Sequence, residues 1–569
     1  MTARTLTALY LSLALSGLMA QTTTPARETP PEQKAYTAAT AITDPEKKIA
    51  ALEKVKTDFA ETPYASLADS QILSTLVTKL PQQTDRIRKA AKISFAEATV
   101  RDKAASKNST FATSNSRGST ANRIADQFIS NDLLLKDAQS YARKGVDAMV
   151  ENVWIADQRE AYAKRKQKIP AQEDLVKRFQ EARAARIATL GRAEMKLGHT
   201  EPARKLLEES YAVTPSNITV AAALGEMATK RGDDAKAMDY LLVARLSGHA
   251  PDAANLAFEA AYKKGHNGSL DGVEAMLDAE YHKRYPNPVH VTAYKPTEKR
   301  SDRLVLAEIF TGSGCPPCAG ADIAFDAAME RYSRKDLAVV MYHVHIPRPD
   351  PMTTPETTAR AKNYAVTGVP TFAIDGKKTV GGGSRDMAPG VFERFQKDLE
   401  TDLETAAEAA VKVDASLTTS GVKVSAAVDG VKSESKDLKV QILLVEREIR
   451  HLGENGVRFH PMVVRAFGGE KGEGYVLAPK GSGTFEAVFD LAAVSQAIKA
   501  HLDDYEAKGH RGEPFKFTAK KYEINRNDLA VVVIVQDDKT HHVLQSAYVD
   551  LGTPAGAHPT TESTGVNQK

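Results

Sequence analysis

The chain has 569 residues, of which 42% are apolar and 26% are charged, as is typical of soluble globular proteins. At about 150 residues per domain, this length disfavours a single domain and predicts three or four. The formal net charge of +3 is close to neutral for this length. Electrostatics therefore give no reason to expect a nucleic acid or an anionic membrane as the main partner.

Residues 1–20 have the pattern of an export signal. Arg4 is their only charged residue, the segment from Leu6 to Leu18 is apolar or small, and Ala20 ends a small-residue cleavage site. We therefore predict a signal peptide over residues 1–20 and a mature protein that is periplasmic or secreted. An uncleaved anchor is the alternative, although the apolar run is short for a membrane span. No later segment predicts a span.

The following region reads as helical. Residues 21–35 are rich in Thr, Pro and Glu and are expected to be disordered. Asp44 and Pro45 then suit the N-cap and the first position of a helix. Apolar residues at helical spacing predict further helices over 67–80, 87–100 and 124–154. The polar segment 101–120 between them is expected to be a mobile loop.

An internal repeat with a period of 34 residues begins near residue 188. The recurring pairs are Leu190 and Leu224, Gly191 and Gly225, Gly198 and Gly232, Ala203 and Ala237, and Leu207 and Leu241. The period and these small-residue positions resemble the tetratricopeptide repeat. The resemblance implies a helical domain over residues 36–286 that binds peptide or protein segments on a concave face, or else serves as a structural spacer.

The only two cysteines follow an apolar strand expected over residues 304–310 and a turn of small residues. If Cys315 and Cys318 form a disulfide within one molecule, they can pair only with each other. In an exported protein this spacing favours redox chemistry or a disulfide over a zinc site. A structural zinc ion normally takes four ligands, and no second cysteine pair supplies them.

The elements after the cysteines complete a recognisable order. We expect a helix over 319–332, a strand over 337–345, a polar helix over 356–364, a strand opened by Gly368-Val369-Pro370-Thr371 and a helix over 391–403. This order resembles the thioredoxin fold over residues 297–404, and the Cys-Pro-Pro-Cys motif is similar to that of periplasmic thiol–disulfide oxidoreductases. The resemblance implies a cis bond before Pro370, opposite the cysteines, where the backbone of Val369 pairs with a bound peptide.

The cysteine spacing suits thiol–disulfide exchange. The N-terminus of a helix favours a thiolate, and we expect Cys315, as its first and more exposed residue, to be the nucleophile. Cys318 would then be the resolving thiol. Pro316 and Pro317 remove two N–H donors, which predicts moderate acidity for Cys315 and a reductant or isomerase rather than a strong oxidant. No cofactor is expected.

Two further sets of polar residues are candidates. The resemblance implies a buried acid six residues before the first cysteine, where this chain has Ile309. Glu308 is the candidate proton acceptor if a bulge re-aims it, and a structural carboxylate otherwise. His343 and His345 share one face of a strand and are either a metal pair without a third ligand or ordinary core histidines. The segment 347–364 either rims the active site or is only a long loop.

From residue 410 the apolar period changes to two, as in Val422 and Val424 or Val531 and Val533. The pattern predicts an antiparallel β-sandwich over residues 408–552, with a helical insertion at 492–506. Residues 553–569 are expected to be a disordered tail. The expected fold class is thus multidomain: a TPR-like helical domain, an α/β thioredoxin-like domain and a β-sandwich.

The predicted function is an exported thiol–disulfide oxidoreductase that reduces or isomerises protein disulfides and is recharged by an unidentified redox partner. The alternative is a non-catalytic interaction or scaffold protein with a structural or redox-sensing module. A peroxidase has less support, because no Thr-x-x-Cys arrangement with a paired Arg stands out. Burial of the sulfurs, or a large distance from Pro370, would favour the scaffold.

Overall fold

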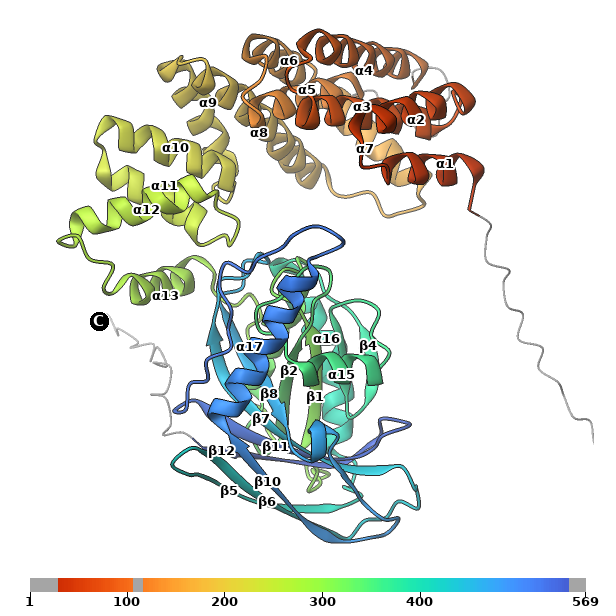
Figure 1. Ribbon diagram of the computed structural model, residues 1–569, viewed down its shortest axis with the longest axis vertical. Helices are drawn as coiled ribbons and strands as arrows, with labels where there is room; N and C mark the ends of the chain where they lie inside the picture. The colour runs from red at the N-terminus through yellow and green to blue at the C-terminus, as the bar shows by residue number, and fades with distance from the viewer. Residues whose placement is uncertain (1–28, 106–115, 552–569) are drawn as a thin grey trace, which may run out of the picture. The chain divides into compact units, whose positions relative to one another are not determined.

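The computed structural model describes residues 29–105 and 116–551 (Figure 1). The expected signal peptide, residues 1–20, and the expected tail, residues 553–569, lie outside the described residues. No helix in the described part of the chain is both long and apolar enough to cross a membrane.

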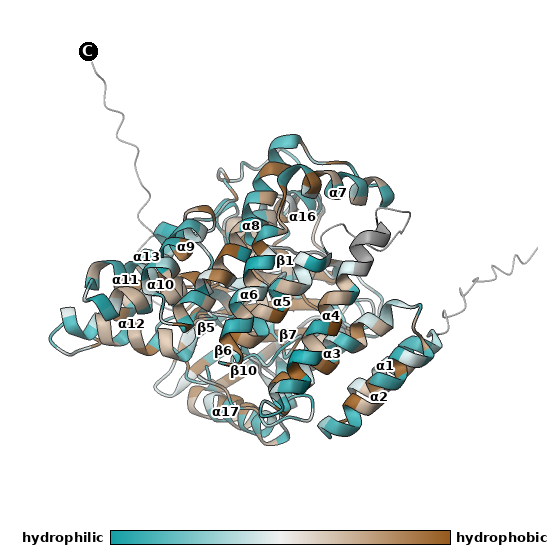
Figure 2. Ribbon diagram, turned by 90° about the horizontal axis from the view of Figure 1, so that it is seen from above, coloured by the Kyte–Doolittle hydropathy of each residue, from teal (hydrophilic) through white to brown (hydrophobic). Residues whose placement is uncertain are grey.

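Two compact units make up the chain, Met1–Thr214 and Pro215–Lys569, and each is considered by itself. Helices build the described part of the first unit: α1 Pro31–Thr40, α2 Pro45–Asp58, α3 Pro63–Lys79, α4 Thr84–Ala105, α5 Ser116–Ser130, α6 Leu135–Asp147, α7 Glu151–Lys164, α8 Gln172–Lys196 and α9 Thr200–Val213. Figure 2 shows apolar residues alternating with polar ones along several of them. Buried side chains of α2 to α6, such as Leu52, Leu76 and Phe128, form one hydrophobic cluster.

The predicted start of α2 is confirmed. Asp44 accepts a hydrogen bond from a backbone N–H of the first turn, and Pro45 occupies the first helical position. The expected disorder of residues 21–35 is wrong for residues 31–35, which begin α1 with a proline in its first turn. The expected loop over 101–120 is wrong for residues 101–105 and 116–120, which belong to α4 and α5. Residues 106–115 lie outside the described residues.

The 34-residue period corresponds to two similar helix hairpins, α8–α9 and α10–α11 (α10 Ile218–Arg231, α11 Asp234–Arg245). In the first hairpin, a Cβ at Gly191 would lie 2.9 Å from the side chain of Leu207. In the second, a Cβ at Gly225 would lie 2.7 Å from the side chain of Leu241. Both glycines therefore permit a close approach of paired helices, which explains why the same residue types recur.

The second unit continues with helices α12 Asp252–Gly265 and α13 Val273–Arg284 and then forms a mixed sheet. Its strands are β1 Val305–Thr311, β2 Leu337–His343, β3 Thr371–Ile374, β4 Lys377–Val380, β7 Leu438–Arg450, β8 Phe459–Phe467, β9 Tyr475–Val476, β11 Leu529–Asp537 and β12 Val543–Asp550. Within the described residues the order is β12-β11-β7-β8-β2-β1-β3-β4, and β9 pairs with β7.

The sheet runs without a break across the domain boundary expected near residues 404–408. β1 pairs in parallel with β2 and antiparallel with β3. A single parallel pairing of Met341 with Val463 then joins β2 to β8, and the C-terminal strands follow (Figure 1). Strands from both expected domains therefore share one sheet.

Helices cover both faces of the sheet around β1. Helices α14 Cys318–Arg331 and α16 Ala388–Leu403 lie on one face, where the rings of Phe325 and Phe395 stack with their centroids 4.3 Å apart. Helix α15 Pro355–Asn363 lies on the other face. Because strand side chains alternate, Thr311 faces α14 and Glu308 faces α15.

A separate three-stranded sheet has the order β10-β6-β5, from β5 Ala410–Leu417, β6 Gly421–Asp429 and β10 Gly483–Asp490. Its inner side chains, including Val424, form a hydrophobic cluster with Ile442 of β7 and Val531 of β11. This second layer therefore covers the C-terminal part of the large sheet. The predicted helical insertion is α17 Leu491–Lys508.

Candidate functional site

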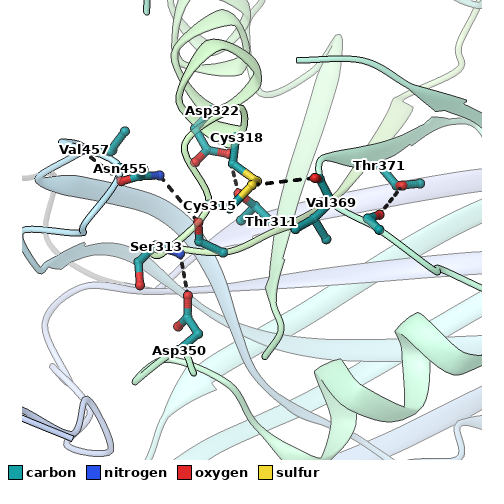
Figure 3. The surroundings of a disulfide bond; sticks show 12 residues. Thr311, Ser313, Cys315, Cys318, Asp322, Asp350, Val369, Thr371, Asn455 and Val457 are labelled. Carbon is teal, nitrogen blue, oxygen red and sulfur yellow. Dashed lines mark hydrogen bonds between the residues drawn. A yellow bond between two sulfur atoms is a disulfide. The ribbon is translucent and has the colours of Figure 1, made fainter. Parts of the chain in front are cut away.

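Cys315 and Cys318 form a disulfide where β1 leads into α14, with their Cα atoms 5.3 Å apart (Figure 3). The helix begins at Cys318 and Pro317 is its N-cap, so Cys315 lies in the preceding turn. The prediction that Cys315 is the first residue of the helix is therefore wrong. The N–H of Cys318 donates to the carbonyl oxygen of Cys315 at 3.0 Å. This N–H, which the two prolines leave as the next backbone donor after Cys315, is therefore occupied.

Both cysteines are buried, with 0% of their surface exposed, and the prediction that Cys315 is the more exposed one is wrong. The segments that contain Arg348 and Gly382 lie close against the cysteine turn, because glycines leave room for the approach. A Cβ at Gly314 would lie 3.0 Å from Arg348, and one at Gly382 would lie 2.3 Å from the carbonyl oxygen of Pro317. Access to either sulfur therefore requires these covering segments to move.

The peptide bond between Val369 and Pro370 is cis, as the resemblance implies. The Sγ atom of Cys315 lies 3.6 Å from the carbonyl oxygen of Val369 (Figure 3). The fold thus brings together the cysteine pair and the Val369-Pro370 turn. After reduction, a Cys315 thiol at this position would be close enough to donate a weak hydrogen bond to that oxygen.

Glu308 faces away from the side of the sheet that carries the cysteine helix. β1 pairs with both neighbours without a register shift, so no bulge re-aims the carboxylate. Its Oε1 accepts hydrogen bonds from Arg360 at 2.6 and 2.8 Å and from Tyr342 at 2.9 Å, and its Oε2 accepts one from Tyr364. This position fits the alternative expectation of a structural carboxylate.

Asp322 is the buried acid beside the disulfide, and our sequence analysis did not identify it. It lies one turn after Cys318 on α14, and Figure 3 shows it next to that cysteine. Thr311 donates to its Oδ1 at 2.8 Å, while its Oδ2 is buried without a hydrogen-bond partner in the described residues. Burial raises the pKa of Asp322 to about 7. An Asp four residues after Cys318, among small and apolar residues, was the available sequence signal.

A buried network holds the turn before Cys315. Asp350 accepts hydrogen bonds from the N–H of Ser313 at 2.6 Å and from His343 Nδ1 at 3.0 Å. Burial alone would raise the pKa of Asp350, but His343 and these hydrogen bonds hold it well below its usual range. The segment from 347 to 364 therefore rims the cysteine site through Asp350 and Arg348.

The two histidines proposed as a possible metal pair have other partners. His343 pairs with Asp350, and Nδ1 of His345 accepts a hydrogen bond from the N–H of Asp350 at 2.9 Å. Among residues 29–105 and 116–551, no group of three or more His, Cys, Asp or Glu side chains is arranged to hold a metal ion. Both histidines thus take part in the packing and hydrogen bonding of the rim.

The loop between β7 and β8 also reaches the site. The N–H of Asn455 donates to the carbonyl oxygen of Ser313 at 2.9 Å, and Glu454 forms an ion pair with Arg348. The C-terminal strands therefore supply part of the wall around the cysteine turn. No local sequence pattern indicates this contact, because the two segments are far apart in the chain.

A scan against protein-family models finds no match, and a search of curated proteins finds no significantly similar sequence. The geometry of the cysteine site is therefore the basis for the functional inference.

Proposed function

We propose that this chain is an exported thiol–disulfide oxidoreductase that reduces or isomerises protein disulfides. The observation that carries the proposal is the contact between Cys315, at the junction of β1 and α14, and the carbonyl oxygen of Val369. A redox-active disulfide at such a junction lies near the N–H groups and the positive end of a helix.

The arrangement of elements supports a thioredoxin-like region over residues 297–404, with α14 and α16 on one face of β1 and α15 on the other. The repeated hairpins support TPR-like repeats within residues 36–286. The two apolar layers support a sandwich over residues 408–552, although its larger layer is continuous with the thioredoxin-like sheet. Residues 1–20 would direct the chain to the periplasm or the cell exterior.

The proposed reduction begins with the Cys315 thiolate, which attacks one sulfur of a substrate disulfide. A mixed disulfide forms and the other substrate sulfur leaves as a thiolate. Cys318 then loses its proton and attacks the Cys315 sulfur, which closes the Cys315–Cys318 disulfide and releases the second substrate thiolate. Two electrons pass from the dithiol to the substrate, and a partner dithiol must restore them.

Asp322 is placed to accept the proton of Cys318, because it lies one helical turn away and its pKa is raised to about 7. Replacing Asp322 by Asn is expected to slow the Cys318 step by roughly 10-fold or more. The increase of that rate with pH around 7 should also disappear. The measurement is the decay of a preformed Cys315 mixed disulfide between pH 5 and 9. A pH profile identical to that of the wild type would exclude Asp322 from this step.

The Asp322→Asn substitution, which should slow the Cys318 step, should also raise the free energy of unfolding at high pH. Because the pKa of Asp322 is raised on folding, its contribution to the free energy of unfolding falls as pH rises from about 4 to about 7. Asn remains neutral, so the Asp322→Asn variant is expected to be more stable than the wild type at pH 8 by up to about 4 kcal/mol, the equivalent of about three pKa units. Urea denaturation with the disulfide intact would measure this gain, which a merely damaged protein would not show.

Burial of both sulfurs favours a second candidate function, a scaffold with a structural or redox-sensing disulfide. The two candidates differ in whether Cys315 can react with a foreign disulfide. The enzyme requires that the segments near Gly314 and Gly382 open when substrate binds. The scaffold requires no such opening.

A trapping experiment separates these candidates. In a Cys318→Ser variant, Cys315 can form a mixed disulfide but cannot release it. We expect this variant to accumulate a covalent complex with a peptide disulfide, visible as a reducible mass shift. A matched Cys315→Ser variant should form much less. Equal trapping by both variants, or none by either, would favour the scaffold.

A further inference from the structure

A cavity of about 580 Å³ lies within the second unit, against the turn that precedes the disulfide. Five parts of that unit line it: the end of α11 with the start of α12, Glu274 of α13, the β7–β8 loop, the segment Phe515–Lys521, and the turn at Ser313 and Gly314 with Pro349 and Pro351. Its volume is in the range of ligand-binding sites, and Gly314 is the residue next to Cys315.

Close backbone contacts hold these walls together. A Cβ at Gly248, in the α11–α12 loop, would lie 2.0 Å from the carbonyl oxygen of Gly453. Asn455 of the same β7–β8 loop donates its N–H to the carbonyl oxygen of Ser313 at 2.9 Å. The α11–α12 loop therefore contacts the β7–β8 loop, and the β7–β8 loop contacts the cysteine turn. The cavity that these segments line is thus part of the surroundings of the disulfide.

Some of the charged side chains that line the cavity form ion pairs, and others do not. Arg458 binds Glu274 at 2.6 Å and Asp278 at 2.7 Å, so its charge is compensated. Among the described residues, no ion pair is found for three lining cations, Arg245, Lys516 and Lys521, or for one lining acid, Asp252. The unpaired charges of the cavity therefore sum to a positive excess.

One of these cations also has an unused donor. The Nε of Arg245 is buried and has no hydrogen-bond partner in the described residues, while its Nη1 donates to Asn255 at 3.3 Å. Leaving a buried guanidinium N–H without an acceptor is unfavourable. A carboxylate in the cavity would compensate the charge of Arg245 and Lys521.

Aromatic rings form another part of the wall. Phe515 and Phe517 are half-buried, with their ring centroids 4.8 Å apart in an edge-to-face arrangement. Such rings provide an apolar surface for an aliphatic or aromatic side chain. Cations and aromatic rings in one cavity match an acidic residue that has an apolar neighbour, which is more readily supplied by a polypeptide than by a small carboxylate.

We propose that this cavity binds an acidic polypeptide segment with an adjacent apolar side chain, belonging to the substrate whose disulfide is exchanged at Cys315. This inference rests on the proposed function for the identity of the occupant. The cavity would select substrates by the sequence that flanks their cysteines, and Arg245, Lys516 and Lys521 would be its specificity-determining residues.

The test uses a fluorescent 12-residue peptide that contains three Glu and two Leu and has Ser in place of Cys, so that binding requires no sulfur chemistry. A second peptide carries Gln in place of each Glu. Fluorescence anisotropy with the full mature protein should show at least roughly tenfold tighter binding of the Glu peptide. The preference should decrease with added salt.

Lys521→Gln and Arg245→Gln are each expected to remove most of this preference and to leave the binding of the Gln peptide unchanged. Lys480→Gln is the matched control, because Lys480 is an exposed partner of Glu434 and does not line the cavity. Equal binding of both peptides, or an unchanged preference in both cavity variants, would overturn the proposal. Displacement of the Glu peptide by equimolar free glutamate would make this a small-carboxylate site and would overturn the polypeptide assignment.

A kinetic comparison separates this proposal from the proposed function. Peptide disulfides flanked by Glu are expected to have a roughly tenfold lower KM than those flanked by Gln, with kcat unchanged. If the Glu peptide binds as expected but no thiol–disulfide exchange is observed, the proposed oxidoreductase function fails and the proposed peptide site in the cavity stands. If exchange occurs with the same KM for Glu-flanked and Gln-flanked disulfides, only the proposed peptide site in the cavity fails.

Discussion

Replacing Cys315 by Ser is expected to reduce the rate of insulin reduction by at least roughly 100-fold, to the background rate of the dithiothreitol that supplies electrons. The physical reason is that a serine hydroxyl cannot attack a disulfide or carry the covalent intermediate. Cys315 is the cysteine whose sulfur lies 3.6 Å from the carbonyl oxygen of Val369, the group proposed to pair with a bound peptide. The measurement is the turbidity of precipitating insulin chains, recorded with the purified mature protein.

The controls for this experiment must separate chemistry from folding. Cys318→Ser also loses the disulfide, but it keeps the proposed nucleophile and should still form one mixed disulfide per molecule. Circular dichroism of both variants should match that of the reduced wild type. If the Cys315→Ser variant reduces insulin as fast as the wild type, the enzyme proposal fails and the scaffold alternative remains.

Replacing Arg360 by Leu is expected to lower the free energy of unfolding of the second unit by about 3–5 kcal/mol. The Arg360 side chain is buried and donates to Glu308 at 2.6 and 2.8 Å and to Gln536 of β11 at 2.7 Å. Removing it leaves the carboxylate of Glu308 in the interior without its cationic partner. Urea unfolding, followed by the β-sheet signal in circular dichroism, measures the loss.

The chain contains internal controls for this prediction. Trp154 is its only tryptophan and lies in α7 of the first unit, so Trp fluorescence should report a transition that the substitution does not change. Lys230→Leu breaks an exposed ion pair with Glu226 and should cost less than about 1 kcal/mol.

A double variant tests the assigned cause of the loss. In Glu308→Leu with Arg360→Leu, no buried charge is left without a partner, so much of the stability should return. A double variant as unstable as Arg360→Leu alone would show that lost packing, and not the unpaired carboxylate, is responsible.

The local features of the site could be predicted because they depend on residues close together in the chain. Cys315 and Cys318 are three positions apart, so one strand-to-helix turn places both sulfurs within bonding distance. The repeat of Gly191 at Gly225 likewise indicates a helix hairpin, because a glycine is needed wherever the partner helix approaches closely. The cis bond before Pro370 came from family resemblance, since residue preferences alone favour the trans form.

Other features required contacts between distant segments. Strand alternation placed Glu308 on the opposite face of β1, but only the assembled sheet shows that Arg360 neutralises it there. The sequence suggested a domain boundary near residue 404, whereas one continuous sheet crosses it. The pairing of Met341 with Val463 that joins the two parts leaves no local sequence pattern. Asp322 became a candidate only when its burial beside Cys318 was evident.

The sequence by itself thus determined the presence of a cysteine pair at a helix start, the proline turn that accompanies it and the helical repeat, because spacing and backbone preferences act over a few residues. The tertiary structure alone decided that both sulfurs are covered, that Asp322 rather than Glu308 lies beside them and that the β7–β8 loop completes their surroundings. Burial and charge pairing depend on which distant segments meet, and that is a property of the folded chain.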